Sequence, residues 1–595
     1  MTYRAPIDDI RAALDSAAGL PGLMADGTLA GIDADVVGSV LEGAARFAEV
    51  VLDPIDRGGD KAGSKLVDGK VQTPPGWDTA YKAFVDGGWS ALSGTEEFGG
   101  QHLPHVLASS AIEIWCGASL AFGLCPLLTQ GAVDAIRLAA TPELKARFLP
   151  KMVAGEWTGT MNLTEPQAGT DLGALKSKAV PQADGSFRIF GTKIFITYGD
   201  HELTSNIIHL VLARLPDAPA GTRGISLFLV PKFLVNTDGS LGARNDLRAL
   251  SLEHKLGIHA SPTCLMSFGE TDGAVGYLVG ETGRGLNHMF VMMNRARLDV
   301  GMQGVAVAER ATQRAIAYAK DRKQGRTAKT PAGAMAPIIE HPDVRRNLMT
   351  MRALTAAGRA ICLATARELD VSERAADAGV RAAAANRMAL LTPVAKAFST
   401  DIGVEVASIG VQVHGGMGFI EETGAAQHLR DARILPIYEG TNGIQAIDLV
   451  TRKLPLEGGK VVAAYFGDLD ATASELAASN VDGFKRMGER FAEANAALRA
   501  ATVWLGAQVQ GNPDAALAGA TPYLRLFGIA ACGHYLGRGA LLAARSGAAG
   551  GASARQIALA KFFAETFSPG ASGLARTVTE GASSLPGADD AVFAA

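Results

Sequence analysis

Apolar residues recur every three or four positions in residues 1–157, and this spacing predicts a helical domain there. Two such stripes are Ala44, Phe47 and Val51, and Leu107, Ala111, Ile114 and Ala118. Thr141, followed by Pro142 and Glu143, predicts a further short helix that ends near Leu149 and Pro150.

The pattern changes in residues 158–280, where β-branched and aromatic runs alternate with turn residues. A run at 186–190 follows an Asp-Gly turn, a strongly apolar run fills 207–213, and a third run ends at Pro231. Short runs bounded by turn signals are typical of strands. We therefore expect a small antiparallel barrel or sandwich in this part of the chain.

Helical spacing returns in residues 281–455, which we expect to form a helical bundle. One stripe consists of Val344, Leu348, Met351, Thr355, Gly358 and Cys362. A longer, alanine-rich helix is predicted over residues 300–322.

Residues 460–595 predict an additional helical domain. An apolar stripe consists of Met487, Phe491, Ala494, Leu498, Ala501 and Leu505. A helix start signal at Asn480 and Asp482 precedes it, and residues 547–551 are expected to form a loop. The order of elements gives an α+β fold with an N-terminal α domain, a middle β domain, a helical bundle and an extra C-terminal α domain.

Composition narrows the class of protein. The 595 residues are 48% hydrophobic and 19% charged with a net charge of −4, which gives no sign of nucleic-acid binding. No apolar run reaches the 18 residues of a spanning helix, and no secretory signal opens the chain. Five scattered cysteines predict neither disulfides nor a metal site and fit a cytoplasmic protein.

Glu439 is the first candidate for catalysis. It lies between an apolar run that includes Ile437 and the small polar turn 440–443. Apolar neighbours disfavour a charged carboxylate and raise its pKa towards values useful in a general base. Taken alone, the stretch favours a solvated Glu439 before a helix that begins near Ile444, because most glutamates are exposed.

Three further segments carry candidate binding groups. Residues 161–171 offer hydroxyls and backbone amides that suit a phosphate or a ring carbonyl, although the segment also fits a structural turn. Phe195 and Thr197 share one side of a predicted strand. Considered on its own, Phe195 is predicted to be a core residue. The glycines of 412–418 do not have the spacing of a dinucleotide-binding fold. His414 could be catalytic, but we expect a loop residue that bonds to the backbone.

Together these segments resemble the acyl-CoA dehydrogenase family. The matching motifs are Asn162-Leu-Thr-Glu-Pro-x-Ala-Gly-Thr-Asp171, Gly191-x-Lys-x-Phe-Ile-Thr197, Gln412-x-x-Gly-Gly-x-Gly418 and Ile437-Tyr-Glu-Gly-Thr-x-x-Ile-Gln445. They occur in the order and at the spacing of that family over roughly residues 40–455. The N-terminal Tyr3-Arg-Ala-Pro6 and the extra C-terminal domain are similar to the large subgroup of the family, whose chains are about as long as this one.

The resemblance implies FAD as cofactor and assigns roles to individual positions. The flavin and its pyrophosphate would contact Met161, Leu163, Thr164, Gly169, Thr170, Phe195, Thr197, Thr441 and Asn442. A neighbouring subunit's FAD would be reached by Arg322, Gln412, Gly415 and Gly416. The acyl-CoA site would include Thr170, Asn294, Arg297, Tyr438 and Gly440. Implied partners are an acyl-CoA, an electron-transfer flavoprotein and further copies of the chain in a dimer or tetramer.

The implied reaction is α,β-dehydrogenation of an acyl thioester with Glu439 as the base. Some relatives carry their base on the helix before the position of Arg297, but Ala296 stands there and cannot act. Two departures from the family affect the flavin contacts: Phe195 replaces a common Trp, and 322–326 reads Arg-Lys-Gln-Gly-Arg without the usual aromatic residue. An acyl-CoA oxidase, a dehydrogenase for short or medium straight chains, and a non-catalytic scaffold remain as alternatives.

Overall fold

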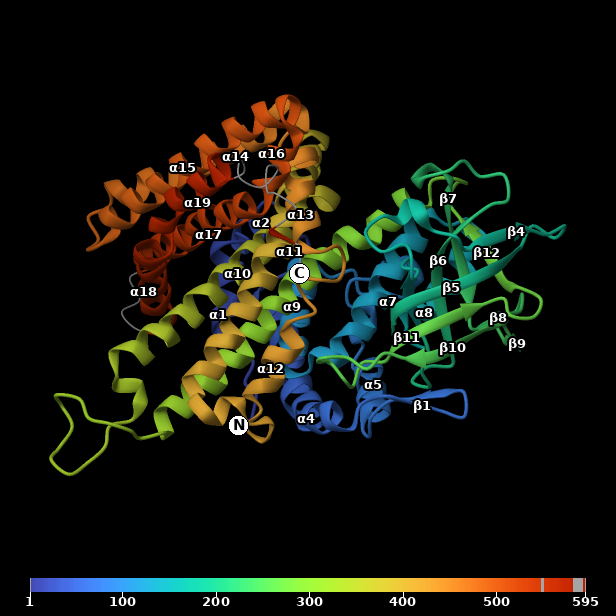
Figure 1. Ribbon diagram of the computed structural model, residues 1–595, viewed down its shortest axis with the longest axis horizontal. Coiled ribbons are helices and arrows are strands. Elements are labelled where there is room, and N and C mark those ends of the chain that lie inside the picture. The colour runs from blue at the N-terminus through green and yellow to red at the C-terminus, as the bar shows by residue number, and fades with distance from the viewer. Residues whose placement is uncertain (1, 547–550, 582–591, 594–595) are drawn as a thin grey trace.

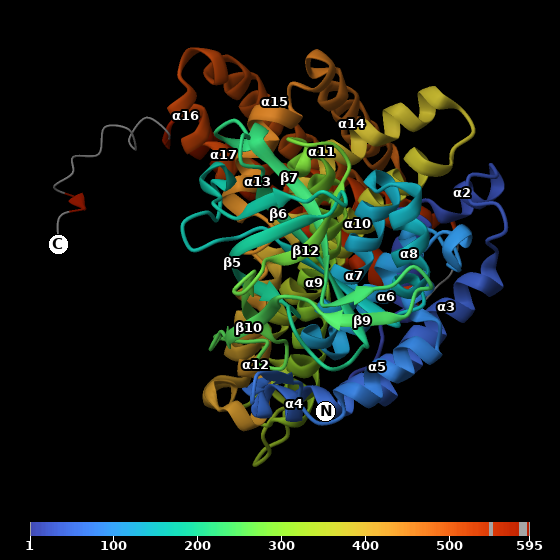
Figure 2. The same ribbon diagram turned by 90° about the vertical axis from the view of Figure 1, so that its right-hand side faces the viewer.

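The computed structural model describes residues 2–546, 551–581 and 592–593, and shows a helical body with a β domain on one side (Figure 1). Residues 547–550 of the predicted loop lie outside the described residues, and Gly551 begins a helix. The C-terminal helices cover one end of the helical body, with α4 at the opposite end (Figure 2).

The N-terminal part is helical, as predicted. Its helices are α1 (Ile7–Ser16), α2 (Leu20–Ala25), α3 (Ala34–Phe47), α4 (Asp53–Ala62), α5 (Trp77–Asp86), α6 (His105–Ala118), α7 (Leu120–Ala139) and α8 (Pro142–Val153), with a hairpin of β1 (Lys65–Val67) and β2 (Lys70–Gln72). Thr141 caps α8 as expected, but the predicted end at Pro150 is wrong. The helix continues because Met152 and Val153 are buried, and their packing offsets a cost of about 3 kcal/mol for an internal proline.

The β domain differs from the antiparallel prediction because it also contains parallel strand pairs. Its strands are β3 (Trp157–Asn162), β4 (Lys178–Pro181), β5 (Phe187–Thr197), β6 (Asn206–Arg214), β7 (Ile225–Pro231), β8 (Phe233–Val235), β9 (Leu241–Arg244), β10 (Leu247–Leu252), β11 (Thr263–Phe268) and β12 (Ala274–Val279). The main sheet runs β10-β11-β5-β12-β7-β6-β3 and is mostly antiparallel, whereas β3 lies parallel to β6 along its whole length. Both strands are almost entirely buried, which is typical of parallel pairs.

Three long helices form the bundle. They are α9 (Gly285–Asp321), α10 (Pro342–Arg374) and α11 (Ala378–His414), followed by the short helices α12 (Ala425–Ala432) and α13 (Asn442–Asp448). The helix predicted over 300–322 is the second half of α9, which begins earlier. Leu348, Met351 and Cys362 of the predicted stripe are buried, so this face of α10 does form core.

The C-terminal part is helical as predicted and packs on α10 and α11. Its helices are α14 (Lys460–Ala478), α15 (Phe484–Gly511), α16 (Pro513–Ala518), α17 (Ala520–Arg545), α18 (Gly551–Thr566) and α19 (Ala571–Thr579). The whole predicted stripe of α15 is buried. Its start was misplaced, because Gly483 with φ 77° forms the N-cap instead of Asn480 or Asp482.

One helix has the length and composition of a membrane span. In α17 an apolar window of 18 residues passes that test, but 83% of the window is buried inside the protein. The helix packs against α10, α11 and α15. Within the described residues it is therefore a core helix of the C-terminal part.

Candidate active site around Glu439

Glu439 lies in a strained turn between α12 and α13, here called the base turn (residues 438–442). Its φ is 56°, and the following Gly440 has φ 86°. Glycine adopts this left-handed region freely, whereas other residues pay about 1–3 kcal/mol for it. Such strain persists only where the surroundings hold the backbone in place.

Three side chains hold the carbonyls of the base turn. Arg297 Nε donates to Glu439 O at 3.3 Å, and Lys396 Nζ donates to Gly440 O at 3.0 Å. Gln445 Nε2 bonds to both carbonyls, at 3.4 Å and 3.2 Å. Because these donors come from α9, α11 and α13, the turn is fixed by three helices at once.

Burial and the two neighbouring cations act in opposite directions on the carboxyl of Glu439. Burial raises the pKa of Glu439 to about 6, against the opposing effect of the Arg297 and Lys396 cations. Burial lowers the pKa of the Lys396 ammonium to about 7, although the Glu439 carboxylate acts in the opposite direction. A carboxyl with a pKa near 6 is largely ionised at neutral pH and still basic enough to accept a proton.

The backbone N–H of Glu439 is an unused donor. No described residue accepts a hydrogen bond from it, whereas the neighbouring Tyr438 and Asn442 N–H groups donate to Ile434 O and Pro436 O. Buried backbone donors are almost always paired. A ligand oxygen placed beside this N–H would therefore complete the turn.

The side chains of Tyr438, Thr441 and Asn442, the other expected site residues of the base turn, each bond to other parts of the chain. Tyr438 Oη donates to the Gln303 side chain, and Thr441 caps α13 through Ile444 N. The Asn442 amide is tied inward: Nδ2 donates to Asp401 Oδ1 at 2.6 Å, and Oδ1 accepts from Lys396 at 2.8 Å. Of Asn442, only the backbone is left for contact with a cofactor.

The expected flavin residues of the β domain come together where β3 ends beside β5. Ile194 N donates to Thr164 O at 2.9 Å. A bulge follows in β5, and there Phe195 adopts φ 61° and is 59% exposed. Its interpretation as a core residue is wrong, because the bulge turns the ring out of the sheet. An exposed aromatic face beside the 161–164 segment fits a flat ring system.

A buried ion pair fixes this arrangement. Lys193 Nζ donates to Glu165 at 2.8 Å and to Leu163 O at 3.1 Å, so the charge of β5 is bonded to the segment that follows β3. Burial alone would raise the pKa of Glu165, but Lys193 and donors from residues 176–177 lower it to about 2. Beyond the pair, Gly169 and Thr170 are exposed, and a Cβ at Gly169 would meet nothing within 4 Å. That open backbone can take a bulky anionic group.

Apolar packing joins the β domain to the base. Met161 lies in the same buried cluster as Met293 and Ala296 of α9, and Leu163 packs against this cluster. Ala296 directly precedes Arg297, and Asn294 is half-buried on the same helix. The expected flavin residues Met161 and Leu163 therefore pack against α9, the helix that also carries Asn294 and Arg297.

The residues expected to reach a neighbouring subunit lie apart from this part of α9. Arg322 follows α9, and Gln412, Gly415 and Gly416 lie where α11 ends; all four are exposed and are here called the bundle end. Tyr318 and His414 stack at 4.5 Å and join the two helix ends. His414 bonds Gly410 O at 2.7 Å, which confirms its predicted backbone partner, but it is the last residue of α11 and not a loop residue. At about 1.5 Å per residue, Arg322 is about 38 Å along the helix from Arg297.

Family models match the chain from residue 40 to residue 589. They are the N-terminal domain of acyl-CoA dehydrogenases (40–156), the middle domain (160–271), the C-terminal domain (283–454) and an acetyl-CoA dehydrogenase C-terminal-like domain (465–589). The chain therefore belongs to the acyl-CoA dehydrogenase family, and it is an FAD-dependent oxidoreductase that acts on the CH–CH bond of an acyl-CoA.

Individual relatives sharpen this assignment. A 3-methylmercaptopropionyl-CoA dehydrogenase of Ruegeria pomeroyi is 49% identical over 95% of this chain and 96% of its own length. A butyryl-CoA dehydrogenase of Syntrophomonas wolfei is 38% identical over 83% of this chain and 82% of its own. A broad-specificity linear acyl-CoA dehydrogenase of Mycobacterium tuberculosis is 35% identical over 78% of both chains.

Solved structures share the fold over nearly the whole chain. Caenorhabditis elegans ACDH-11, solved in complex with C11-CoA, has a TM-score of 0.77 at 20% identity and covers 94% of this chain and 91% of its own. A Bacillus anthracis acyl-CoA dehydrogenase complexed with FAD has a TM-score of 0.75 at 19% identity and covers 94% and 90%. At these identities the likeness concerns the fold.

Sequence reasoning missed the residues that position the base. Lys396, Gln445 and Gln303 are fully or almost fully buried and were assigned no role. A signal existed for Lys396, because it is a lone charge in the apolar run 390–398 of α11, and a buried lysine requires partners. Gln445 belongs to a recognised motif, but its contact with the carbonyls of a left-handed turn needed the folded backbone.

Proposed function

We propose that this enzyme dehydrogenates 3-(methylthio)propanoyl-CoA to 3-(methylthio)acryloyl-CoA, with Glu439 as the base that removes the α-proton. The observation that carries the role of Glu439 is a carboxyl with a pKa near 6, held in a turn whose own N–H is unpaired. The relative that is 49% identical over 95% of this chain supports the substrate. Dimethylsulfoniopropionate demethylation is the pathway in which we place the reaction.

Different residues of this chain would have different roles in proton abstraction. The Glu439 N–H would donate to the thioester oxygen, where negative charge develops as the α-proton leaves. Arg297, Lys396 and Gln445 keep the turn in place, so the carboxyl and the N–H face the same substrate. Met161 and Ala296 contribute to an apolar wall that excludes water and keeps the base desolvated.

Bound FAD would supply the hydride-accepting chemistry for the β-hydrogen. The chain offers an exposed Phe195 ring, the backbone beside Leu163 and Thr164, and the open backbone at Gly169 to hold it. We place Thr197 at the ring and Thr170 between cofactor and substrate. We further propose that an electron-transfer flavoprotein reoxidises the enzyme and that the chain forms a homodimer or homotetramer in the cytoplasm, where buried free thiols such as Cys116 stay reduced.

Anaerobic bleaching of the bound flavin tests this function. Purified enzyme is mixed with 3-(methylthio)propanoyl-CoA or with straight-chain acyl-CoA thioesters from C4 to C16, and the flavin absorbance is followed in a stopped-flow instrument. The expected result is the highest kcat/KM for the methylthio substrate. A clear preference for butyryl-CoA would contradict the substrate and leave the reaction class intact.

An oxidase on the same scaffold is the second candidate. Peroxide release in air without an added electron acceptor would identify it. Turnover that requires an electron-transfer flavoprotein supports the dehydrogenase. A purified protein that holds no flavin would contradict both and leave a non-catalytic scaffold.

A further inference from the structure

A groove of about 690 Å³, here called the domain groove, lies where the C-terminal α domain meets the rest of the chain. Its walls come from α2, α10, α11, α14 and α17 (Figure 1). Among the described residues, none of the base turn and none of the β domain lines it. Its volume falls within the roughly 300–1,000 Å³ that small-molecule sites occupy. The groove therefore has room for a metabolite and is separate from the candidate active site.

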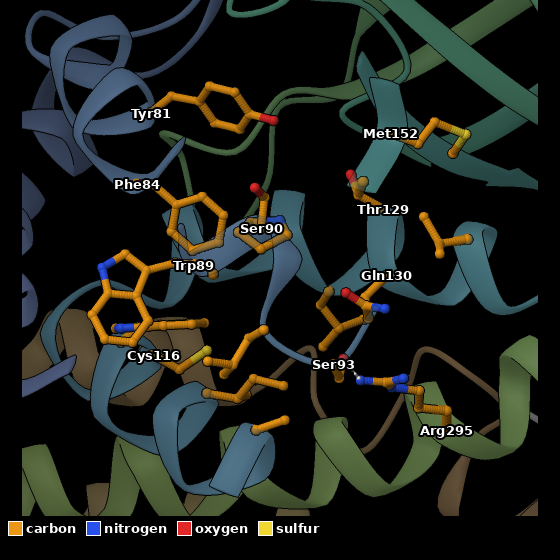
Figure 3. A pocket seen from close by; sticks show the side chains of 18 residues that line it. Tyr81, Phe84, Trp89, Ser90, Ser93, Cys116, Thr129, Gln130, Met152 and Arg295 are labelled. Carbon is orange, nitrogen blue, oxygen red and sulfur yellow. Dashed lines mark hydrogen bonds between the residues drawn. The ribbon is translucent and has the colours of Figure 1, made fainter. Parts of the chain in front are cut away.

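A smaller cavity shows what the domain groove adds. It measures about 40 Å³ and lies between α6, α7 and the turn at residues 89–93 (Figure 3). Its cation, Arg295, already bonds Asp134 at 2.5 Å and Ser93 at 2.7 Å. Because one water needs about 10–15 Å³ of such space, this cavity holds a few waters at most. We assign no ligand to it.

A buried histidine lines the domain groove with one ring nitrogen unpaired. His534 is 7% exposed, and its Nδ1 lies 2.9 Å from Thr472 Oγ1. The Thr472 hydroxyl has no other acceptor among the described residues, so its proton is used only if Nδ1 is unprotonated, which places the ring proton on Nε2. Edge-on contacts with Tyr465 and Tyr535 hold the ring in this orientation. The Nε2–H is therefore a fixed donor without a partner in the described part of the chain.

An unpaired cation lies next to this donor. Arg538 follows His534 by four residues, so both lie on one face of α17. Its Nη2 lies beside the start of α2, 3.9 Å from the position of a Cβ on Gly19, and it has no ion-pair partner among the described residues. Burial and the cations of Arg538 and Arg387 lower the pKa of His534 to about 3, which keeps the ring neutral. A guanidinium beside a free N–H suits an anion.

The other charges of the domain groove are compensated within the protein. Asp26 accepts from Thr28 N at 2.9 Å and is near the cation of Arg367. The remaining charged side chains form the ion pairs Arg367–Glu368, Arg387–Asp468 and Glu475–Arg545. The end of the groove at Arg538 is therefore positive, although the lining as a whole contains acids and bases in similar number.

We propose that the domain groove binds a small organic anion, whose carboxylate or phosphate group is held by Arg538 and the Nε2–H of His534. Apolar side chains such as Leu23 and Val371 line the same groove and would contact the carbon chain of the ligand. A bound anion would connect α17 with α2 and α10, and so would stabilise the attachment of the C-terminal α domain. This site is independent of the reaction at Glu439.

Thermal unfolding of the FAD-loaded enzyme tests the site. The additions are butyrate, its neutral isostere butyramide, and inorganic phosphate, all at constant ionic strength. We expect butyrate or phosphate to raise Tm, because a ligand that binds the folded state stabilises it, and butyramide to have no effect. A larger rise with butyrate indicates a carboxylate ligand, and a larger rise with phosphate indicates a phosphorylated one.

Variants of the anion-binding groups locate the effect. Arg538→Gln, at an exposed position, should weaken the anion's apparent affinity by about tenfold or more, the effect of one charge-assisted hydrogen bond. His534→Phe keeps a flat ring, removes the N–H and should act in the same direction. Arg576→Gln changes an exposed arginine of α19 outside the groove and should retain the native response.

Two results would overturn the proposal. One is the absence of any Tm rise with either anion, and the other is an equal rise in the native enzyme and in Arg538→Gln. Anions that bind at the flavin or acyl-CoA site would give this equal rise, since Arg538 lies outside both. Flavin bleaching by an acyl-CoA should be the same in Arg538→Gln as in the native enzyme, so failure of the groove leaves the proposed function standing.

Discussion

The base turn and the bundle end each contain a residue with positive φ, but their surroundings are opposite. Glu439 and Gly415 have φ values of 56° and 61°. Arg297, Lys396 and Gln445 bond to the base turn from inside the chain, whereas a Cβ at Gly415 or Gly416 would meet nothing within 4 Å. One region is complete within a single chain, and the other offers exposed backbone and an Arg322 side chain without an ion-pair partner among the described residues.

This difference fits the proposed homo-oligomer, in which a second copy would cover the bundle end. A strained turn that catalyses must be rigid, and internal side chains supply that rigidity. A glycine corner with a free cation suits the phosphate of a ligand held by another copy. The 38 Å or so of α9 between the two regions makes it implausible that they serve one flavin ring within one chain.

The largest effect is expected at the base itself. Glu439→Gln should lower turnover by about 10²- to 10⁴-fold, because a positioned base contributes that much, while flavin content and acyl-CoA binding persist. Stopped-flow flavin reduction and a binding titration measure the two. Glu457→Gln changes another glutamate with positive φ, at an exposed site, and serves as control. Near-normal turnover in Glu439→Gln would refute the assignment of the base.

Lys396→Met should lower kcat/KM at pH 7 by about 10- to 100-fold, since it removes two hydrogen bonds and a charge at the base turn. Loss of a cation that lowers the Glu439 pKa raises that pKa further above 6. The acidic limb of the pH profile, on which the ionised base appears, should therefore move to higher pH. Lys396→Arg should restore part of the activity.

The matched control for this change is Lys460→Met, at an exposed lysine that begins α14. It should leave the pH profile in place. An acidic limb that keeps its position in Lys396→Met would mean that the ammonium has no electrostatic effect on the base, whatever happens to the rate.

At the bundle end, Arg322→Ala should weaken FAD binding by about tenfold, the loss of one charge-assisted hydrogen bond. Arg326→Ala, an exposed arginine of the same loop, is the control and should retain FAD. Flavin released on dilution, measured by fluorescence, gives the affinity.

Mixed oligomers sharpen this result. If each site combines two copies, a mixed oligomer contains one site with both an intact Glu439 and an intact Arg322. The Arg322→Ala chain supplies Glu439, and the Glu439→Gln chain supplies Arg322. Refolding the two variants together should recover flavin and turnover beyond the sum of the separate proteins. Absence of recovery would show that each chain closes its own site.

The smallest effects concern backbone strain. Gly415→Ala should cost about 1–3 kcal/mol of unfolding free energy, because φ 61° with ψ −141° excludes a side chain. Glu439→Gly should cost less than about 1 kcal/mol, since relief of strain offsets the greater freedom of glycine in the unfolded chain. Denaturant unfolding of both variants measures the difference, and equal losses would contradict the strain at Glu439.

The sequence predicts the layout of this fold well because its long stripes are strongly periodic. The buried face of α15 and the α–β–α order follow from spacing alone. What spacing leaves open is decided by tertiary packing: α8 continues through Pro150, and β3 pairs in parallel with a strand more than 40 residues away. The spacing of apolar residues, every two positions in a strand or every 3.6 in a helix, does not show which distant segment an element packs against.

The candidate site, like the fold, has features that the sequence predicts and features that only tertiary packing decides. Glu439 could be proposed as the base from its apolar neighbours together with the family motifs. The burial of Lys396 against the base turn and the bulge that exposes Phe195 depend on contacts between distant segments. Asn442 shows the limit of transferring roles by resemblance. Its position matches a cofactor contact, yet its amide is engaged by Asp401 and Lys396.

The open glycine corner after α11 has a consequence for handling the protein. If a second molecule covers that corner, retention of the yellow colour becomes a property of concentration, because mass action separates the molecules on dilution. A dilute sample would then be colourless and inactive although each polypeptide remained correctly folded. Activity lost in this way should return when the sample is concentrated again with added FAD.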